Sequence, residues 1–285
     1  MTLLRDAMRK VLMGWREDLS PSWQSLFAAV EPDFAAIPEE LTFDPAEPVI
    51  PSRKGLPLIG APAGAHIFRA FDAVTPKAAR VLVVGQDPYP RISRATGRAF
   101  EDGALTSWTG SVAVSLQHLV QSALSLRLAR PELAVNGGGW ATIRGEVTAG
   151  TIALEPLGAY FDRLQMAHGV LFVNAGWTLT RFISGGGPEQ QAHIALWRPL
   201  MTQLLKGLSD RDEGRIVFLL LGGFAQRLFK ASGVETEAKR RGIWGLQVRA
   251  VAHPHPNTAA YFLKPNPLQA VNSALAAINS EAVLW

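Results

Sequence analysis

Residues 81–90 read Val-Leu-Val-Val-Gly-Gln-Asp-Pro-Tyr-Pro, an apolar run that passes directly into a polar turn. The run is uncharged and rich in branched side chains, which is typical of a parallel strand buried on both faces. In the turn, Asp87 precedes Pro88 and Pro90, whose rings fix the backbone and so hold the carboxylate in place. The stretch predicts a buried strand that ends in a rigid acidic turn.

Three more short apolar runs follow along the chain, and helical patterns separate them. The runs cover residues 170–173, 216–221 and 246–251, and the helical segments cover 111–128, 190–206 and 223–232. Strands that alternate with helices indicate an α/β fold. We expect a three-layer α/β/α arrangement around a central, mostly parallel four-stranded sheet.

Polar residues follow each of the four apolar runs. The clusters are Gly85–Pro90, Asn174–Thr178, Gly222–Gln226 and His253–Thr258. Ligands bind outside the carboxyl ends of the strands in open parallel sheets. The topology therefore predicts that all four clusters contribute to one site.

The rest of the chain is expected to belong to the same domain, which spans residues 1–285. Residues 1–64 form an N-terminal helical region, in which Ser20 caps a helix that starts at Pro21. A further helix is predicted from His66 to Val74. Residues 127–160 include a glycine-rich stretch without clear periodicity, and we interpret them as an insertion or a long loop.

Composition excludes some classes of protein and favours others. The 285 residues contain no cysteine, which excludes disulfides, Cys-ligated zinc and iron–sulfur clusters. The net charge of +4 fits an anionic partner such as DNA, and fits equally an ordinary soluble protein. No apolar stretch of about 18 residues or signal-peptide core occurs, so we expect a cytoplasmic protein without membrane contact.

Several motifs together resemble those of the uracil-DNA glycosylase family. They are Val84-Gly85-Gln86-Asp87-Pro88-Tyr89 with Gly97-Arg98-Ala99-Phe100, then Gly169–Asn174, then His253-Pro254-His255-Pro256. The similarity runs in order from about residue 65 to 272. It implies a monofunctional DNA repair enzyme that hydrolyses the N-glycosidic bond of uracil and leaves an abasic site. It implies no metal and no other cofactor.

The resemblance also implies a pocket for a base turned out of the DNA stack. Phe100 would stack on the base, and Tyr89 would clash with a 5-methyl group and so reject thymine. The amide of Asn174 would donate to O4 and accept from N3–H, whereas cytosine presents the opposite pattern. Gln86 would contact the uracil edge or help to place water. A core Phe, a packed Tyr and an Asn that merely ends a strand remain the alternatives.

Two residues are implied as catalytic. Asp87 would stabilise positive charge on the sugar and orient the attacking water. His253 would donate to the developing anion at O2 while remaining neutral. A helix-capping Asp and a turn histidine are the structural alternatives.

A further set of residues is expected to hold the DNA. It comprises Ser115, Gly222, Gly223, His255, Asn257, Thr258, Arg91 and Arg94, with Arg98 as another cation near the first motif. The alternatives are a helix N-cap for Ser115 and a solvated face for the arginines.

Two departures from the family pattern concern DNA binding. Asn257 stands where the family usually has a leucine wedge, which fills the space left by the flipped base. A short amide fills that space poorly, so we expect weak duplex retention and loose binding of the abasic product. Glu101 and Asp102 are unexpectedly acidic beside a DNA site.

The sequence leaves alternative functions open. One is a glycosylase of broader specificity for deaminated bases such as hypoxanthine or xanthine, and another is a non-catalytic protein that binds damaged DNA. In the leading interpretation the partner is uracil-containing DNA, single- or double-stranded. Free uracil is then the product, and the enzyme acts as a monomer.

Overall fold

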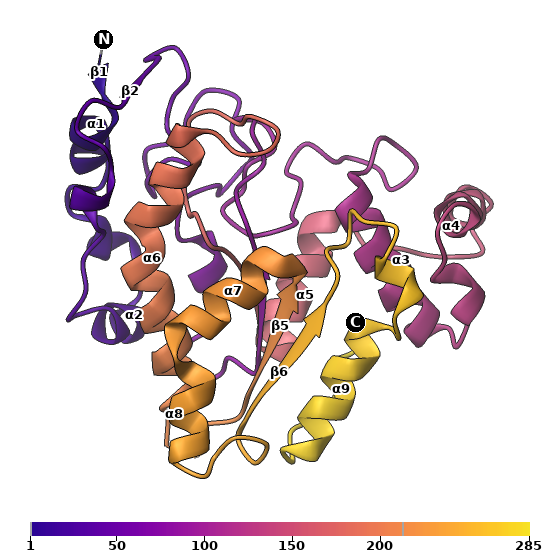
Figure 1. Ribbon diagram of the computed structural model, residues 1–285. Coiled ribbons are helices and arrows are strands. Elements are labelled where there is room, and N and C mark those ends of the chain that lie inside the picture. The colour runs from indigo at the N-terminus through magenta and orange to yellow at the C-terminus, as the bar shows by residue number, and fades with distance from the viewer. Residues whose placement is uncertain (1, 213) are drawn as a thin grey trace. The chain divides into compact units, whose positions relative to one another are not determined.

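The computed structural model describes residues 2–212 and 214–285 (Figure 1). Its contacts divide the chain into two compact units that interleave in sequence. The first unit comprises Met1–Lys77, Gly85–Ala104 and Phe172–Leu208. The second comprises Ala78–Val84, Leu105–Leu171 and Ser209–Trp285.

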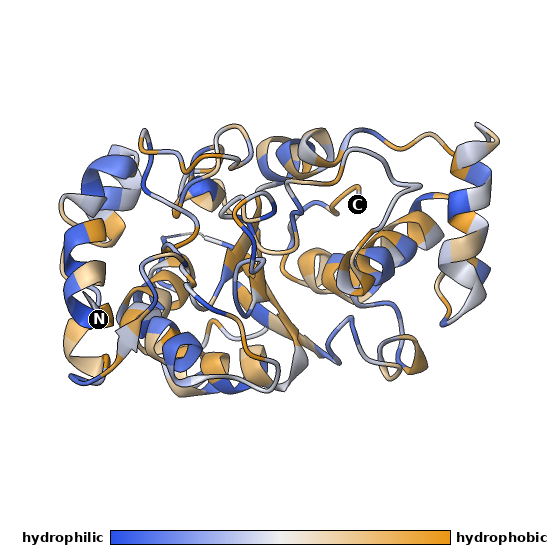
Figure 2. Cartoon of the chain, turned by 90° about the horizontal axis from the view of Figure 1, so that it is seen from above, coloured by the Kyte–Doolittle hydropathy of each residue, from blue (hydrophilic) through white to orange (hydrophobic). Residues whose placement is uncertain are grey.

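The predicted α/β fold with a parallel sheet is confirmed. The strands β3 (Val81–Gly85), β4 (Val170–Asn174), β5 (Ile216–Leu221) and β6 (Val248–His253) follow the order β4-β3-β5-β6. Pairing is parallel between β3 and β5 and between β5 and β6, and helices flank the sheet. Every residue of β3, β4 and β5 is buried, which explains their unbroken apolar sequences, and strands of the sheet appear mostly orange in Figure 2.

Helices of the second unit pack on β5 and β6. Helix α7 (Gly222–Ser232) contacts β5 and continues into α8 (Val234–Arg240), while α9 (Pro267–Ala277) lies along β6 (Figure 1). Asn266 starts α9, since its side chain accepts hydrogen bonds from the backbone N–H groups of Leu268 and Gln269. The unit also holds α3 (Val114–Arg127) and α5 (Leu157–His168).

The first unit is built around an aromatic core. It contains the short antiparallel pair β1 (Thr2–Leu3) and β2 (Thr42–Phe43), α1 (Leu4–Val11), α2 (Pro21–Leu26) and most of α6 (Pro188–Ser209). Trp177 stacks on Trp197 at 4.8 Å between ring centroids and meets Phe71 edge-on at 5.4 Å. These contacts anchor the segment that follows β4.

Two predicted elements differ from the structure here, and a third is described below. Residues 66–74 hold only a 3-10 turn, Arg69–Phe71, because the ring of His66 accepts a hydrogen bond from the N–H of Phe68 and competes with helix formation. The fourth strand begins at Val248, because the backbone turns at Ile243, whose carbonyl accepts from Leu246 and Gln247.

The third correction concerns the segment 127–160, which is not a long loop throughout. It contains α4 (Gly138–Thr148), where Trp140 and Ile143 are buried three residues apart. The glycines at its start conceal the helical spacing. Gly139 lies so close to the carbonyl of Leu133 that a Cβ would approach its oxygen to 2.4 Å, so α4 packs tightly on the preceding turn.

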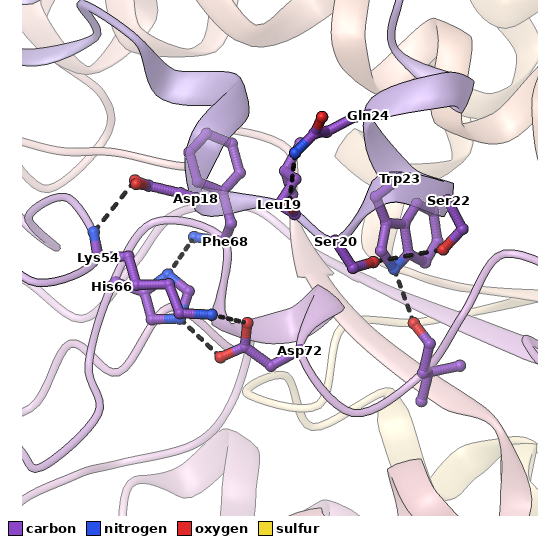
Figure 3. A network of polar contacts seen from close by, with 11 residues as sticks. Asp18, Leu19, Ser20, Ser22, Trp23, Gln24, Lys54, His66, Phe68 and Asp72 are labelled. Atoms are coloured by element: carbon purple, nitrogen blue, oxygen red, sulfur yellow. Dashed lines mark hydrogen bonds and ion pairs between the residues drawn. The ribbon is translucent and has the colours of Figure 1, made fainter.

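A buried ion pair holds the proline-rich connection of the first unit. The guanidinium of Arg53 bonds both carboxylate oxygens of Asp18 and donates to the carbonyl of Gly14 at 2.8 Å. Asp18 also accepts from the backbone N–H of Lys54 at 3.1 Å (Figure 3). Both side chains of the pair are about nine-tenths buried, so neither charge can be hydrated if its partner is lost.

Substitution of Arg53 by alanine therefore leaves the buried carboxylate of Asp18 without its cationic partner. We expect the free energy of unfolding to fall by about 3–5 kcal/mol in urea denaturation. Lys239→Ala, which removes an exposed pair with Glu235, is the control and should change stability little. Equal stability of the Arg53 variant and the unmodified protein would contradict this assignment.

Candidate active site

The turns after β3 and β4 lie against each other in the first unit. The backbone N–H groups of Ala175 and Gly176 donate to the carbonyls of Gly85 and Gln86 at 3.0 and 2.9 Å. A Cβ on Gly85 would stand 2.3 Å from Oδ1 of Asn174 and 2.8 Å from Cβ of Ala99. Only glycine allows this approach, which brings Asp87 and Asn174 into adjoining turns.

Asp87 has one carboxylate oxygen held and one open. Oδ2 accepts a hydrogen bond from Nε2 of Gln190, whereas Oδ1 is buried and lacks a partner of good geometry among the described residues. Burial raises the pKa of Asp87 to about 6, while the amides of Gln190 and Gln86 act in the opposite direction. The group is therefore mainly ionised at pH 7, and its buried Oδ1 can still accept a well-aligned hydrogen bond.

Gly176 leaves room for this carboxylate. A Cβ at that position would lie 3.2 Å from Oδ1 of Asp87 and 3.3 Å from Cγ1 of Ile194. The open oxygen of Asp87 thus faces backbone that carries no side chain.

Gln190 is the residue of this site that the sequence analysis missed. It lies in the first turn of α6, far along the chain from Asp87, and no local motif marks it. The nearest signal was the polar run Glu189-Gln190-Gln191 behind Pro188 at a helix start. Only the tertiary fold shows which of these side chains reaches the carboxylate.

A buried histidine fixes the start of α6. The ring nitrogens of His193 lie 2.9 Å from Oγ1 of Thr178 and 3.2 Å from Oγ1 of Thr180. Burial lowers the pKa of His193 to about 3, so the ring is neutral and acts only as a hydrogen-bonding group. Its hydrogen bonds connect α6, which carries Gln190, to the segment that follows Asn174.

Asn174 presents an unengaged amide. The residue is only 5% exposed, yet its side chain makes no hydrogen bond with any described residue. Neither polar atom of this amide is among the fully buried, unpartnered ones, so the amide can meet a ligand. The side chain is therefore suited to read the donor and acceptor pattern of a bound molecule.

Phe100 and Tyr89 adjoin this corner. Phe100 is a non-glycine residue with φ of +67°, a conformation that costs energy and tends to occur at functional sites. The preceding residue is fixed by a 3.1 Å hydrogen bond from the N–H of Ala99 to the carbonyl of Phe172. The hydroxyl of Tyr89 lies 3.5 Å from the carbonyl of Phe100. The four predicted pocket residues Gln86, Tyr89, Phe100 and Asn174 thus belong to the same unit as Asp87.

The loop before Phe100 packs on His66, which belongs to a polar network with Asp72 and Lys54 (Figure 3). The backbone of Gly97 packs on the carbonyl of His66 so closely that a Cβ would approach its oxygen to 1.9 Å. The ring of His66 bonds Asp72 at 2.7 Å, and Lys54 bonds the other oxygen of Asp72 at 2.9 Å. Burial alone would raise the pKa of Asp72, but these two partners lower it overall.

The acidic residues after Phe100 are balanced within the fold. Asp102 accepts from Nε of Arg94 at 3.0 Å, and the guanidinium of Arg94 covers the ring of Tyr89 at 4.6 Å. Glu101 lies 3.2 Å from the guanidinium of Arg98, which is buried. Arg94 and Arg98 were expected to contact phosphate. Both are paired with carboxylates of the fold, and their contacts with phosphate remain predictions.

His253, in the second unit, is the last residue of β6. Its Nε2 lies 3.1 Å from the carbonyl of Pro265 and its Nδ1 lies 3.3 Å from that of Pro254. The ring packs edge-on against Tyr261 at 4.8 Å. Burial lowers the pKa of His253, so the imidazole is neutral at pH 7 with a single N–H to donate.

The loop after His253 is folded on itself. Nδ1 of His255 lies 2.7 Å from Oδ1 of Asn257, and the hydroxyl of Thr258 donates to the carbonyl of His255 at 2.8 Å. Gly222, with φ of +88°, starts α7, and a Cβ there would stand 2.9 Å from Cβ of His255. Gly223 follows it in the helix. The side chain of Asn257 is thus held within its own turn.

Ser115 is not a helix cap. It is the second residue of α3, and the N-cap position belongs to Ala113, which offers no side-chain acceptor. The hydroxyl of Ser115 lies in a first turn whose backbone N–H groups are open, an arrangement that favours an anion. Arg91 is exposed and makes no ion pair with a described residue. The DNA contacts proposed for both remain predictions.

Comparison with known proteins points to one family. A model of the uracil DNA glycosylase superfamily matches residues 71–276. The uracil-DNA glycosylase of Lactococcus lactis subsp. cremoris is 30% identical over 224 residues, which cover 77% of this chain and 81% of that protein. The corresponding enzyme of Coxiella burnetii RSA 493 is 28% identical over 196 residues, or 69% of this chain and 66% of that protein.

Solved structures show the same fold. The UNG crystal structure from Nitratifractor salsuginis superposes with a TM-score of 0.60 at 19% identity, covering 96% of this chain and 98% of that one. The mimivirus uracil-DNA glycosylase gives a TM-score of 0.60 at 15% identity, with coverage of 100% and 94%.

The contact between Gln190 and Asp87 can be tested by titration. We expect the Asp87 carboxyl carbon to titrate near pH 6 in ¹³C NMR. Gln190→Ala removes a donor that favours the charged form, so the midpoint should rise by about one pH unit. Gln191→Ala, which removes the exposed neighbouring amide, is the control and should leave the midpoint unchanged. A Gln190 variant that titrates like the unmodified protein would rule out this role.

Proposed function

The chain belongs to the uracil DNA glycosylase superfamily, and we propose that it removes uracil from DNA by hydrolysing the N-glycosidic bond. The products are free uracil and an abasic site. The observation that carries the proposal is the pairing of two groups in adjoining turns: a carboxylate with one unpartnered oxygen, on Asp87, and the side-chain amide of Asn174. The carboxylate can stabilise positive charge on the sugar, and the amide can form hydrogen bonds with the base.

Base selection rests on the first unit. The base turns out of the stack, and Phe100 stacks on it. The amide of Asn174 donates to O4 of uracil and accepts from N3–H, and cytosine would leave both of these bonds unmade. Tyr89, backed by the guanidinium of Arg94, occupies the space beside C5 and excludes a methyl group.

Bond cleavage places positive charge on the sugar and negative charge on the base. Ionised Asp87 stabilises the sugar cation through its open oxygen and orients the attacking water. We propose that His253, neutral because of its burial, exchanges its hydrogen bond to a backbone carbonyl for one to O2 of the leaving base. The proton of the attacking water passes to Asp87 or to solvent.

A separate set of groups is expected to hold the DNA. We propose that the hydroxyls of Ser115 and Thr258 and the backbone at Gly222–Gly223 contact phosphates, with Arg91 as a mobile cation. His255 shapes this contact by holding Asn257 and the turn that carries Thr258.

An excision assay tests the proposed activity. The protein should release uracil from single- and double-stranded oligonucleotides in the presence of chelator, as shown by alkaline cleavage of the abasic product. Asp87→Asn keeps the size of the side chain but loses its charge, so the rate should fall by about 10³-fold or more.

Parallel oligonucleotides should carry thymine mispairs, hypoxanthine or xanthine. Absence of cleavage at uracil would reject the proposal, and comparable cleavage at several bases would replace it with a broad-specificity glycosylase. Retained binding of damaged DNA without any cleavage would favour a non-catalytic role.

Asn257 predicts weak retention of the abasic product. Because its amide is held by His255, it cannot fill the space left by a flipped base as an apolar wedge would. Asn257→Leu should therefore bind an abasic-site duplex about tenfold more tightly, with little change for undamaged duplex, when measured by fluorescence anisotropy. Tighter abasic-site binding by the unmodified protein than by the variant would contradict this explanation.

A further inference from the structure

A groove of about 630 Å³ lies in the first unit and begins where the acidic turn ends. Pro90 and Arg91, which continue the loop that carries Asp87, form part of its wall. Arg181 and Phe182, from the segment between β4 and α6, form another part. The groove is therefore built from the continuations of the two turns that hold Asp87 and Asn174.

Ile50 lines the groove and belongs to a fixed piece of backbone beneath it. Ile50 and Leu179 form an isolated antiparallel bridge with two reciprocal N–H···O=C bonds, both 2.8 Å long. Both side chains are buried, and Ile92 packs against them. Because this bridge ties the proline-rich connection to the segment after β4, the walls are held in place without a ligand.

The walls combine exposed apolar groups with free cations. Ile59 is 99% exposed and Phe182 is 50% exposed, so both offer apolar surface to a ligand. Arg91 and Arg181 are exposed and make no ion pair with any described residue, in contrast to Arg94 and Arg98. One acid, Glu47, lies on the rim and opposes them.

We propose that this groove binds the single-stranded DNA that flanks the excised base. Phe182 stacks on a flanking base, and Arg91 and Arg181 contact backbone phosphates. This inference rests on the proposed function, since it extends the substrate from a uracil to the strand that carries it. Cationic side chains interleaved with an aromatic face are the features by which proteins hold single strands without reading their sequence.

The size of the groove agrees with this occupant. Its volume falls within the range of about 300–1,000 Å³ that encloses a drug-sized ligand, which suits one or two nucleotides and not a duplex. A strand that enters the pocket beside Asp87 and Tyr89 continues past Pro90 and Arg91 by the shortest path along the same loop. Together with the short amide at Asn257, the groove shifts binding toward single strands.

The test is direct binding of a fluorescein-labelled thymidine 12-mer without uracil, measured by anisotropy over a range of salt concentrations. The double variant Arg91→Ala/Arg181→Ala should bind at least tenfold more weakly. It should also lower the slope of log K against log salt by about 1.4, since each phosphate contact on a single strand contributes about 0.7. Phe182→Ala should weaken binding about tenfold, and Phe182→Tyr should restore it because a ring face is kept.

Two further variants serve as controls. Arg198→Ala removes an exposed arginine of α6 that makes no ion pair with a described residue and does not line the groove, so it should bind like the unmodified protein. Glu47→Gln removes the opposing charge and should tighten binding about twofold. Unchanged affinity and salt slope in the double variant, or an equal loss in Arg198→Ala, would overturn the proposal.

Uracil release from the same 12-mer, with one uracil at its centre, separates this inference from the proposed function. If the unmodified protein releases uracil and the groove variants bind the oligonucleotide as it does, the proposed role of the groove is wrong and the proposed activity is right. If those variants bind the oligonucleotide more weakly and the unmodified protein releases no uracil, the groove binds single strands and the proposed activity is wrong. Melting temperatures should match across the set, because every substituted side chain is exposed.

Discussion

The close approach of two turns at Gly85 is the constraint on which the rest of the site depends. Without a Cβ at that position, Oδ1 of Asn174 can occupy the space above the end of β3, and two backbone hydrogen bonds lock the turns together. Asp87 lies two residues beyond this contact, and Ala99, which a Cβ on Gly85 would also meet, precedes Phe100. The absence of a methyl group at Gly85 therefore allows the turns that carry Asp87 and Asn174 to meet.

Electrostatics divides the cations near this corner into two groups. Arg94 is paired with Asp102 and covers the ring of Tyr89, and Arg98 is paired with Glu101. Arg91 and Arg181 lack such partners and stay exposed. Burial raises the pKa of Asp87 to about 6, and the hydrogen bond from Gln190 acts in the opposite direction. A formal net charge of +4 shows none of this division.

Much of the fold could be predicted because short-range patterns encode it. The continuous apolar runs predicted the parallel strands, and the motif from Gly85 to Tyr89 predicted the acid. Other features depend on distant partners. Nothing near Gln190 indicates that it meets Asp87, and nothing near Arg94 indicates that Asp102 engages it. The helix α4 escaped prediction because glycines obscure its start, and the helix expected at 66–74 gave way to side-chain hydrogen bonds of His66.

A single-turnover measurement of uracil release by Gly85→Ala tests most directly whether the contact at Gly85 assembles a uracil-excising site. The added Cβ must displace Asn174 or Ala99, and displacements of about 1 Å can cost about 100-fold in rate. We predict a loss of that size with the sheet intact by circular dichroism, and no loss in Gly145→Ala, where a Cβ meets open space. Uracil release by Gly85→Ala at the unmodified rate would contradict the account.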